Sequence, residues 1–291
     1  MGKIEKHELK KGYALTSAGQ VHYRCIGEGD PIVLLPPSGR SCMVYGDLMR
    51  ALSEQHFVIG LDPPGCGQSV APPAGATIEA MGGWLAEAIG NLDLRNVNLF
   101  GLHSGNKLAT ALAANSSGIV RKLVLAGLSH SLIPDPVLRR KLFLKYVPSL
   151  TTAPGTPDQS KALREWMAKY AEINALWLDT SVLNEPLSTE ASMHRLETIV
   201  DYMQALAWKS DLLKATLAYP FEKDLARLTM PTLILEIVTP EEERLLGHQG
   251  PMMRTIIEDF HWVALSEPDM KRPTFTHRAF DIRDAMTEFL R

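Results

Sequence analysis

The chain has 291 residues, of which 45% are apolar and 22% carry a charge. This composition is typical of a soluble globular protein and excludes a disordered or collagen-like chain. Thirty basic and 33 acidic residues give a net charge of −3, so no basic surface is expected to bind nucleic acid or an anionic membrane. At about 150 residues per domain, the length predicts one large domain or one domain with an insertion.

The three cysteines, Cys25, Cys42 and Cys66, lack the C-x-x-C spacing of a zinc site and are too few for a disulfide framework. Residues 1–6 are too charged for a signal peptide, and no run of 18 apolar residues is long enough to cross a membrane. We therefore expect a cytoplasmic protein that is not bound to a membrane.

The first elements in chain order are Gly12–Ser17 and Val21–Cys25, which predict an antiparallel hairpin. Short apolar runs then alternate with stretches that carry apolar residues three and four positions apart. This pattern is typical of parallel strands joined by crossover helices. The expected strands are Ile32–Leu35, Phe57–Leu61, Val97–Phe100 and Leu123–Ala126, and the expected helices are Tyr45–Gln55, Thr77–Gly90 and Lys107–Ala114.

The pattern changes in the second half of the chain. From about Pro134 to Leu228 it is helical, and strands resume with Pro231–Glu236 and Trp262–Leu265 before a last helix from about His277 to Leu290. We predict an α/β core domain of residues 1–133 and 229–291, with a mostly parallel central sheet flanked by helices. A helical cap of residues 134–228 is expected to interrupt it.

Several short motifs resemble those of a known superfamily. Residues 62–69, Asp-Pro-Pro-Gly-Cys-Gly-Gln-Ser, are similar to a D-x-x-G-x-G-x-S turn, in which glycines permit a positive φ. Pro231-Thr232-Leu233 and Glu288-Phe289-Leu290 resemble the re-entry strand and the closing helix of the same proteins. The chain thus resembles the cap-bearing branch of the α/β-hydrolase superfamily, which implies the α/β-hydrolase fold.

The resemblance includes the nucleophile elbow, a strand-to-helix turn written G-x-S-x-G. Here Gly101-Leu102-His103-Ser104-Gly105 puts His103 where the family has serine. A register with Ser104 at the apex would place Leu102 and Asn106 where side chains crowd the turn. The small residues Ala109 and Ala113 also fit the His103 register, because the elbow helix packs small residues against the sheet.

The other two triad positions also depart from the family pattern. The position implied for the acid falls near Pro240, with Glu241 beside it and Glu236 at the strand end. The position implied for the histidine falls near residues 271–272, where none occurs, and His277 follows a few residues later. His130, just after the Leu123–Ala126 strand, is a further candidate to complete a dyad with His103.

The loop implied to form the oxyanion hole carries Pro36-Pro37-Ser38 in place of the usual His-Gly. Because backbone donors do not depend on the side chain, the amides of Ser38 and Ser104 are expected to face the pocket. One such donor contributes about 10²–10³ in rate.

These observations favour an enzyme that acts, without cofactor or metal, on a small, partly apolar carbonyl compound. In this hypothesis His103 is the base in place of the serine nucleophile, and the reaction is of the hydrolase or the lyase/decarboxylase type. Two alternatives stay open: a ligand-binding member of the fold without catalysis, and a serine hydrolase or esterase that uses Ser104. The expected partner is a small-molecule substrate, and a homodimer stays open.

Overall fold

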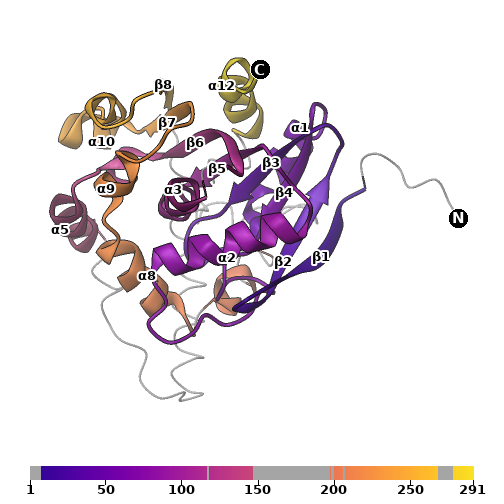
Figure 1. The fold of residues 1–291 in the computed structure, drawn as a ribbon. Coiled ribbons are helices and arrows are strands. Elements are labelled where there is room, and N and C mark those ends of the chain that lie inside the picture. Colours follow the sequence, from indigo (N-terminus) through magenta and orange to yellow (C-terminus); the bar gives the residue numbers. More distant parts are fainter. Residues whose placement is uncertain (1–7, 117, 147–196, 198–199, 206, 268–277) are drawn as a thin grey trace, which may run out of the picture.

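The computed structural model describes residues 8–116, 118–146, 197, 200–205, 207–267 and 278–291. Within them, one eight-stranded sheet has the order β1-β2-β4-β3-β5-β6-β7-β8, as Figure 1 shows. The strands are β1 (Lys10–Thr16), β2 (Gly19–Ile26), β3 (Asp30–Leu35), β4 (His56–Leu61), β5 (Val97–Leu102), β6 (Val120–Leu128), β7 (Thr232–Val238) and β8 (Phe260–Ser266).

The sheet is antiparallel at one edge and parallel elsewhere. β1 pairs with β2, and β2 with β4, in the antiparallel direction, whereas all pairs from β3 to β8 are parallel. The hairpin and the six later strands all lie where the sequence predicted them. Because parallel strands end at the same edge of a sheet, the loops after β3, β5, β6 and β7 come together there.

The helices are η1 (Cys42–Tyr45), α1 (Gly46–Leu52), α2 (Ile78–Asn91), α3 (Gly105–Asn115), α4 (Ser129–Leu132), α5 (Pro136–Tyr146), α8 (Lys209–Ala218), α9 (Phe221–Leu225), α10 (Pro240–Leu246), η4 (Gly250–Thr255) and α12 (Ala279–Leu290). Local signals explain where several of them begin. Thr77 caps α2 by accepting a hydrogen bond from the Ala80 amide, and Thr239 caps α10 in the same way through the Glu242 amide.

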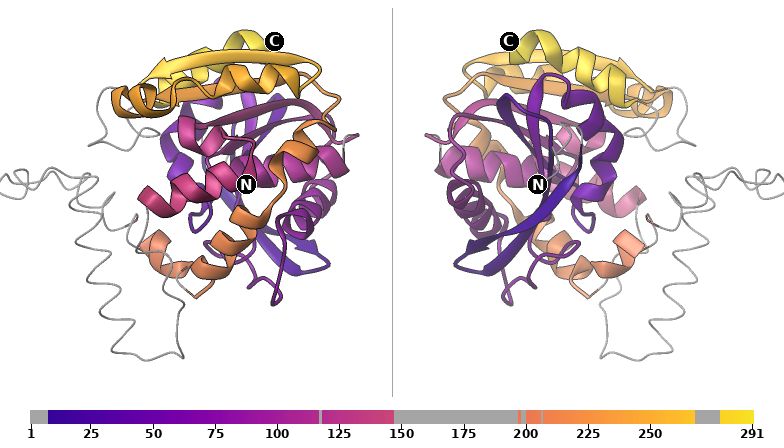
Figure 2. Two further views of the ribbon diagram at one scale, coloured as in Figure 1. Left: turned by 90° about the vertical axis from the view of Figure 1, so that its left-hand side faces the viewer. Right: turned by 90° about the vertical axis from the view of Figure 1, so that its right-hand side faces the viewer.

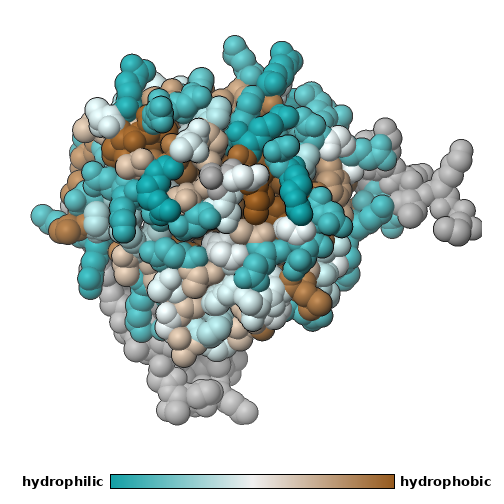
Figure 3. All heavy atoms as spheres, in the orientation of Figure 1, coloured by the Kyte–Doolittle hydropathy of each residue, from teal (hydrophilic) through white to brown (hydrophobic). Residues whose placement is uncertain are grey.

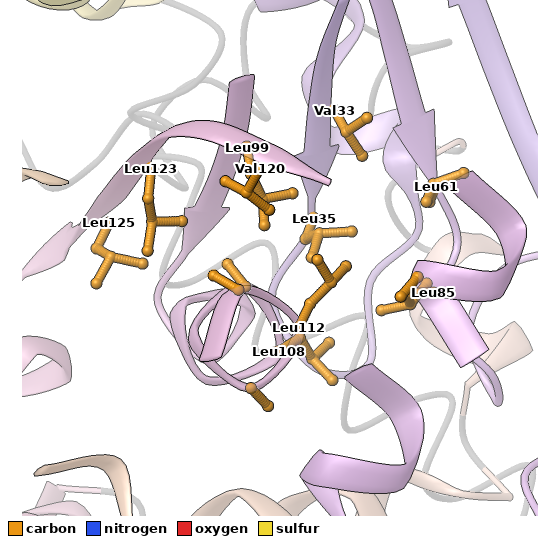
Figure 4. Close-up of a cluster of buried hydrophobic side chains, with 14 of the residues drawn as sticks. Val33, Leu35, Leu61, Leu85, Leu99, Leu108, Leu112, Val120, Leu123 and Leu125 are labelled. Atoms are coloured by element: carbon orange, nitrogen blue, oxygen red, sulfur yellow. The ribbon is translucent and has the colours of Figure 1, made fainter. Parts of the chain in front are cut away.

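Two hydrophobic layers enclose the sheet. Alternate residues of one strand face opposite sides, so Val33 and Leu35 pack toward α2 and α3, whereas Ile32 and Leu34 pack toward α1 and α12. Figure 4 shows the first layer, where leucines of α2 and α3 meet side chains of four neighbouring strands. The strands from β4 to β7 in the sheet order are therefore largely buried on both sides, as their continuous apolar runs predicted, whereas β8 at the edge has no fully buried residue.

The cap is described only in part. Residues 147–196 lie outside the described residues, and the described part contains the helices α5, α8 and α9. Phe221 and Leu225 of α9 are buried in the layer beneath the sheet that also contains α3. Both views in Figure 2 place α12 at the top of the molecule and α8 toward the bottom, so these two helices do not share a face. The division into residues 1–133, 134–228 and 229–291 stays a prediction.

The described atoms on the face seen in Figure 3 are mainly hydrophilic, with hydrophobic side chains in small separate areas. Across the described ranges, no helix combines the length and the apolar character that a membrane span requires.

Candidate active site

The turn after β5 carries the residue expected at the nucleophile position. β5 ends at Leu102, His103 follows with a φ of 50°, and α3 begins at Gly105. Ser104 has a φ of −68° and a ψ of −21°, which are helical values. A positive φ is unfavourable for a residue with a side chain and marks a turn that the surrounding structure enforces. His103, and not Ser104, therefore stands at the apex of the elbow.

Glycines on both sides of His103 permit this turn. A Cβ atom on Gly101 would lie 2.6 Å from the carbonyl oxygen of Gly105. A Cβ atom on Gly105 would lie 2.3 Å from the carbonyl oxygen of Leu35 on β3. Any larger residue at either position would collide with the backbone. The spacing of the two glycines thus fixes which residue reaches the apex.

The imidazole of His103 lies against the end of β6. Its Nδ1 is 3.3 Å from Ser131 Oγ and accepts a hydrogen bond of 3.4 Å from the Leu128 amide. Gly127 makes room for the ring, because a Cβ atom there would lie 3.0 Å from Nδ1. Burial, His130 and Lys107 lower the pKa of His103 from 6.5 to about 3. The imidazole is therefore neutral near pH 7.

A second histidine lies beside His103. His130 is in the short helix α4 after β6, and its ring stacks on that of His103 with centroids 6.3 Å apart and planes 13° apart. Nδ1 of His130 donates a hydrogen bond to the carboxylate of Glu242, which belongs to α10 after β7. The side chains of His130 and Glu242 are 32% and 18% exposed. Neighbouring parallel strands thus bring two imidazoles and one carboxylate together.

The acid of this cluster is one residue later than predicted. Glu241 is exposed and Glu242 is half-buried, although both follow Thr239 at the start of α10. Successive residues of a helix point about 100° apart, so only one of them faces α4. The structure therefore pairs His130 with Glu242, and the role expected for Glu241 stays a prediction. The sequence Thr-x-x-Glu is a signature of a helix start, and this spacing distinguishes Glu242 from Glu241.

The loop after β3 binds the hydroxyl of Ser104. The Ser38 amide donates a hydrogen bond of 2.6 Å to Ser104 Oγ, so one of the two expected oxyanion donors already has an acceptor. Pro37 is half-buried, and its carbonyl oxygen accepts from the Arg40 amide at 3.0 Å. Within the described part of the chain, Ser104 Oγ has no hydrogen bond to a histidine. This arrangement differs from that of an activated serine, whose hydroxyl pairs with a basic side chain.

Comparison with known proteins identifies the family. The family model described as "alpha/beta hydrolase fold" matches residues 31–159. A hydrolase of Acinetobacter baylyi, (E)-2-((N-methylformamido)methylene)succinate hydrolase, is 31% identical over 210 residues, which cover 69% of this chain and 75% of the relative. The chain belongs to the α/β-hydrolase family.

Two further proteins are similar to this α/β-hydrolase. A soluble epoxide hydrolase of Corynebacterium sp. is 28% identical over 126 residues, 43% of this chain and 44% of the relative. The crystal structure of the enol-lactonase from Burkholderia xenovorans LB400 superimposes with a TM-score of 0.70 at 21% identity, covering 96% of this chain and 99% of that one. At this identity the structural likeness shows the fold alone.

Another candidate of the α/β-hydrolase, Glu236, makes its contacts outside this cluster. Glu236 is buried on β7, where it accepts hydrogen bonds from the amides of Gln249 and Gly250 at 2.7 and 3.1 Å and from Trp262 Nε1 at 3.1 Å. It therefore holds the loop before η4. His277 falls outside the described residues.

One group of potential metal ligands occurs among the described residues of the α/β-hydrolase. Atoms of His22, Cys42 and Asp62 lie within 4.8 Å of one another, and all three residues are buried. Asp62 already accepts from His22 Nδ1 at 2.8 Å and from the amides of Cys42 and Gln68 at 2.7 and 3.1 Å. These bonds satisfy the carboxylate, so Asp62 fixes the loop backbone after β4.

The sequence reasoning missed Lys107. It lies in the first turn of α3 with 1% of its surface exposed, and its Nζ donates to the carbonyl oxygens of Ser131 and His103. Burial and then Arg139 hold the pKa of this amine well below its usual value. A lysine among the small and apolar residues of the elbow helix was the signal, because a charged side chain rarely faces a sheet.

Proposed function

We propose that this α/β-hydrolase hydrolyses a small, partly apolar carbonyl compound without a covalent intermediate and without a cofactor or metal. The observation that carries the proposal is the pair of stacked imidazoles, His103 and His130, with Glu242 behind the second. A histidine at the elbow cannot form the ordinary acyl-serine. Direct attack of water on the carbonyl carbon is the reaction that this set of groups favours.

His130 is the general base in this proposal. The Glu242 carboxylate only accepts hydrogen bonds, so it holds the proton of His130 on Nδ1 and leaves the lone pair on Nε2. His103 was the base expected from the sequence, but a group with a pKa of about 3 accepts a proton weakly at pH 7. The role of the base therefore passes to His130.

His103 helps to hold the reacting water. The ring centroids are 6.3 Å apart and the ring planes lie 13° from parallel, so the two imidazoles border the same part of the site. A neutral imidazole can hydrogen-bond to a water molecule there without competing for the proton. In this proposal the water binds next to both rings, and His130 removes a proton as the oxygen attacks the substrate.

The amide of Ser104 stabilises the negative charge that develops on the carbonyl oxygen. Ser104 precedes α3, and the first amides of a helix have no acceptor within that helix. The Ser38 amide adds a second donor once the substrate oxygen displaces the Ser104 hydroxyl from it. These backbone groups retain the oxyanion hole that the resemblance implied.

The relative from Acinetobacter baylyi suggests the kind of carbonyl. Its name describes a formamide whose nitrogen is attached to an alkene that is conjugated with a carboxylate. Such a nitrogen leaves readily, so water can attack the carbonyl without a covalent nucleophile. We therefore propose activated amides, esters or lactones as the substrate class and that compound as the first to test.

The test is product analysis in ¹⁸O-labelled water. Hydrolysis puts one ¹⁸O atom into the released acid, whereas a lyase or decarboxylase yields products without label from that step. Turnover of (E)-2-((N-methylformamido)methylene)succinate, or of an activated ester or lactone, with label in the acid is the expected result. Products without ¹⁸O would favour a reaction of the lyase or decarboxylase type. Thermal stabilisation by these compounds without any product would favour a ligand-binding protein.

A matched pair of glutamate variants tests the role of Glu242. Glu242→Gln should lower kcat about 10²-fold or more, because the amide no longer fixes and supports His130. Glu241→Gln removes the neighbouring, exposed carboxylate and should leave kcat unchanged. Equal effects of the two substitutions would contradict the proposed dyad.

A further inference from the structure

The ammonium group of Lys107 joins two segments of the candidate site. Its Nζ donates a hydrogen bond to the carbonyl oxygen of Ser131 and another, of 3.4 Å, to that of His103. Ser131 directly follows His130, which carries one imidazole, and His103 itself carries the other. Lys107 is thus a bridge between the backbones on which the two rings are mounted.

The surroundings of Lys107 hold it in place. Nζ lies 4.5 Å from the centroid of the Phe221 ring, and the guanidinium carbon of Arg139 lies 5.7 Å from the same centroid. Within the described residues, no carboxylate lies within 4.0 Å of Nζ. Two carbonyl oxygens and an aromatic face are therefore the groups that stabilise this buried amine.

A buried lysine without an acidic partner is costly for the fold. Desolvation of an ammonium group opposes folding, and replacement of a buried charge by an apolar side chain of similar volume is often neutral or stabilising. Methionine has a similar length and would fill the same space. The hydrogen bonds to the two segments are what such a replacement would lose.

We propose that Lys107 is a positioning residue that sets the distance between the imidazoles of His103 and His130. The inference rests on the proposed function, because it explains how the two rings keep the relative positions that the reaction requires. Lys107 acts from behind the site, through the backbones of the elbow and of α4. Its loss should disturb the chemistry more than the fold.

The experiment compares Lys107→Met with the unmodified protein by thermal unfolding, by proton NMR of the histidine rings and by kinetics. We expect the melting temperature to be unchanged or raised. The ring-proton signals of His103 and His130 should shift, since each ring lies in the magnetic field of the other. kcat should fall about 10- to 100-fold with a smaller change in KM, as expected for misplaced catalytic groups.

Lys122→Met is the matched control. Nζ of Lys122 also donates to a backbone carbonyl oxygen, that of Phe289 at 2.6 Å, and lies 5.4 Å from an aromatic centroid, but Lys122 is near the start of β6 and its partner is at the end of α12. This variant should leave the histidine signals and kcat unchanged. Lys107→Arg keeps a charged donor and should restore part of kcat relative to Lys107→Met.

Unchanged histidine signals together with unchanged kcat in Lys107→Met would overturn the inference. A Lys107→Met variant that does not fold would also overturn it, because Lys107 would then belong to the framework. If the unmodified protein turns over none of the compounds tested, the proposed function fails, while the NMR shifts still report whether Lys107 sets the geometry of the rings.

Discussion

A polar residue directly follows β4 and another directly follows β5, and the two residues make different kinds of contact. Asp62 follows β4 and His103 follows β5, and each begins a tight turn. Asp62 is buried and accepts three hydrogen bonds of 2.7 to 3.1 Å from its own turn and its neighbours. His103 is half-buried, has contacts of 3.3 and 3.4 Å at Nδ1, and lies beside another imidazole.

This difference in contacts distinguishes a structural residue, Asp62, from a candidate catalytic residue, His103. A carboxylate whose hydrogen bonds are short and internal is satisfied, and moving it would disrupt the turn. An imidazole that lies beside a second titratable ring is a candidate for chemistry. We therefore expect substitutions at the β4 exit to change stability and substitutions around the β5 exit to change activity.

The largest effect is expected for His130→Gln. Removal of the proposed base should lower kcat about 10²- to 10⁴-fold, because general base catalysis contributes that much. The side chain is 32% exposed, so the free energy of unfolding should change by less than about 1 kcal/mol. Steady-state kinetics with urea unfolding of the same preparation measures both. A kcat close to that of the unmodified protein would remove His130 from the mechanism.

Asp62→Asn should show the opposite pattern. Burial alone would raise the pKa of Asp62, but hydrogen bonds from His22 and Cys42 and the Gln68 amide lower it below its usual value, so the turn binds the charged form. Loss of these charge-assisted bonds should lower the free energy of unfolding by about 3 kcal/mol. The folded fraction should keep its kcat. A large fall in kcat with unchanged stability would contradict the structural role of Asp62 and its difference from His103.

Acid should destabilise the fold through His103. The pKa of this group is about 3 in the folded protein and about 6.5 when unfolded, so between these values only the unfolded chain takes up the proton. Stability is therefore lost as the pH falls below 6.5. From pH 7.5 to pH 5 this loss amounts to about 2 kcal/mol. His103→Asn, which tolerates the positive φ, should lose that much less over the same range in urea titrations.

The smallest effect is expected for Ser104→Ala. The hydroxyl accepts from the Ser38 amide, and its removal should cost about 1 kcal/mol of stability or less. kcat should stay the same or rise, since the Ser38 amide becomes available to the substrate. A fluorophosphonate probe should leave no adduct in an intact mass spectrum. An adduct at Ser104, or loss of activity in Ser104→Ala, would support the serine hydrolase alternative.

The sequence predicted the strands and most of the core helices, because their apolar residues repeat with the periods of strands and helices. It also placed His103 at the elbow, since Gly101 and Gly105 restrict the turn locally. His130 was named as a candidate partner of His103 from its place after a strand, but its contact with Glu242 could not be derived in the same way. His130 and Glu242 lie 112 residues apart, and only the pairing of β6 with β7 brings them together. Which glutamate faces α4 depended on the rotation of α10.

The absence of a side chain at Gly127 decides whether the imidazole of His103 has room. A side chain there would collide with Ser131 Oγ at 2.3 Å and press on His103 Nδ1 at 3.0 Å, so the imidazole fits only while position 127 lacks a Cβ atom. The residues at positions 103, 127 and 131 therefore depend on one another sterically, so a substitution at one of them changes which side chains the other two positions can hold.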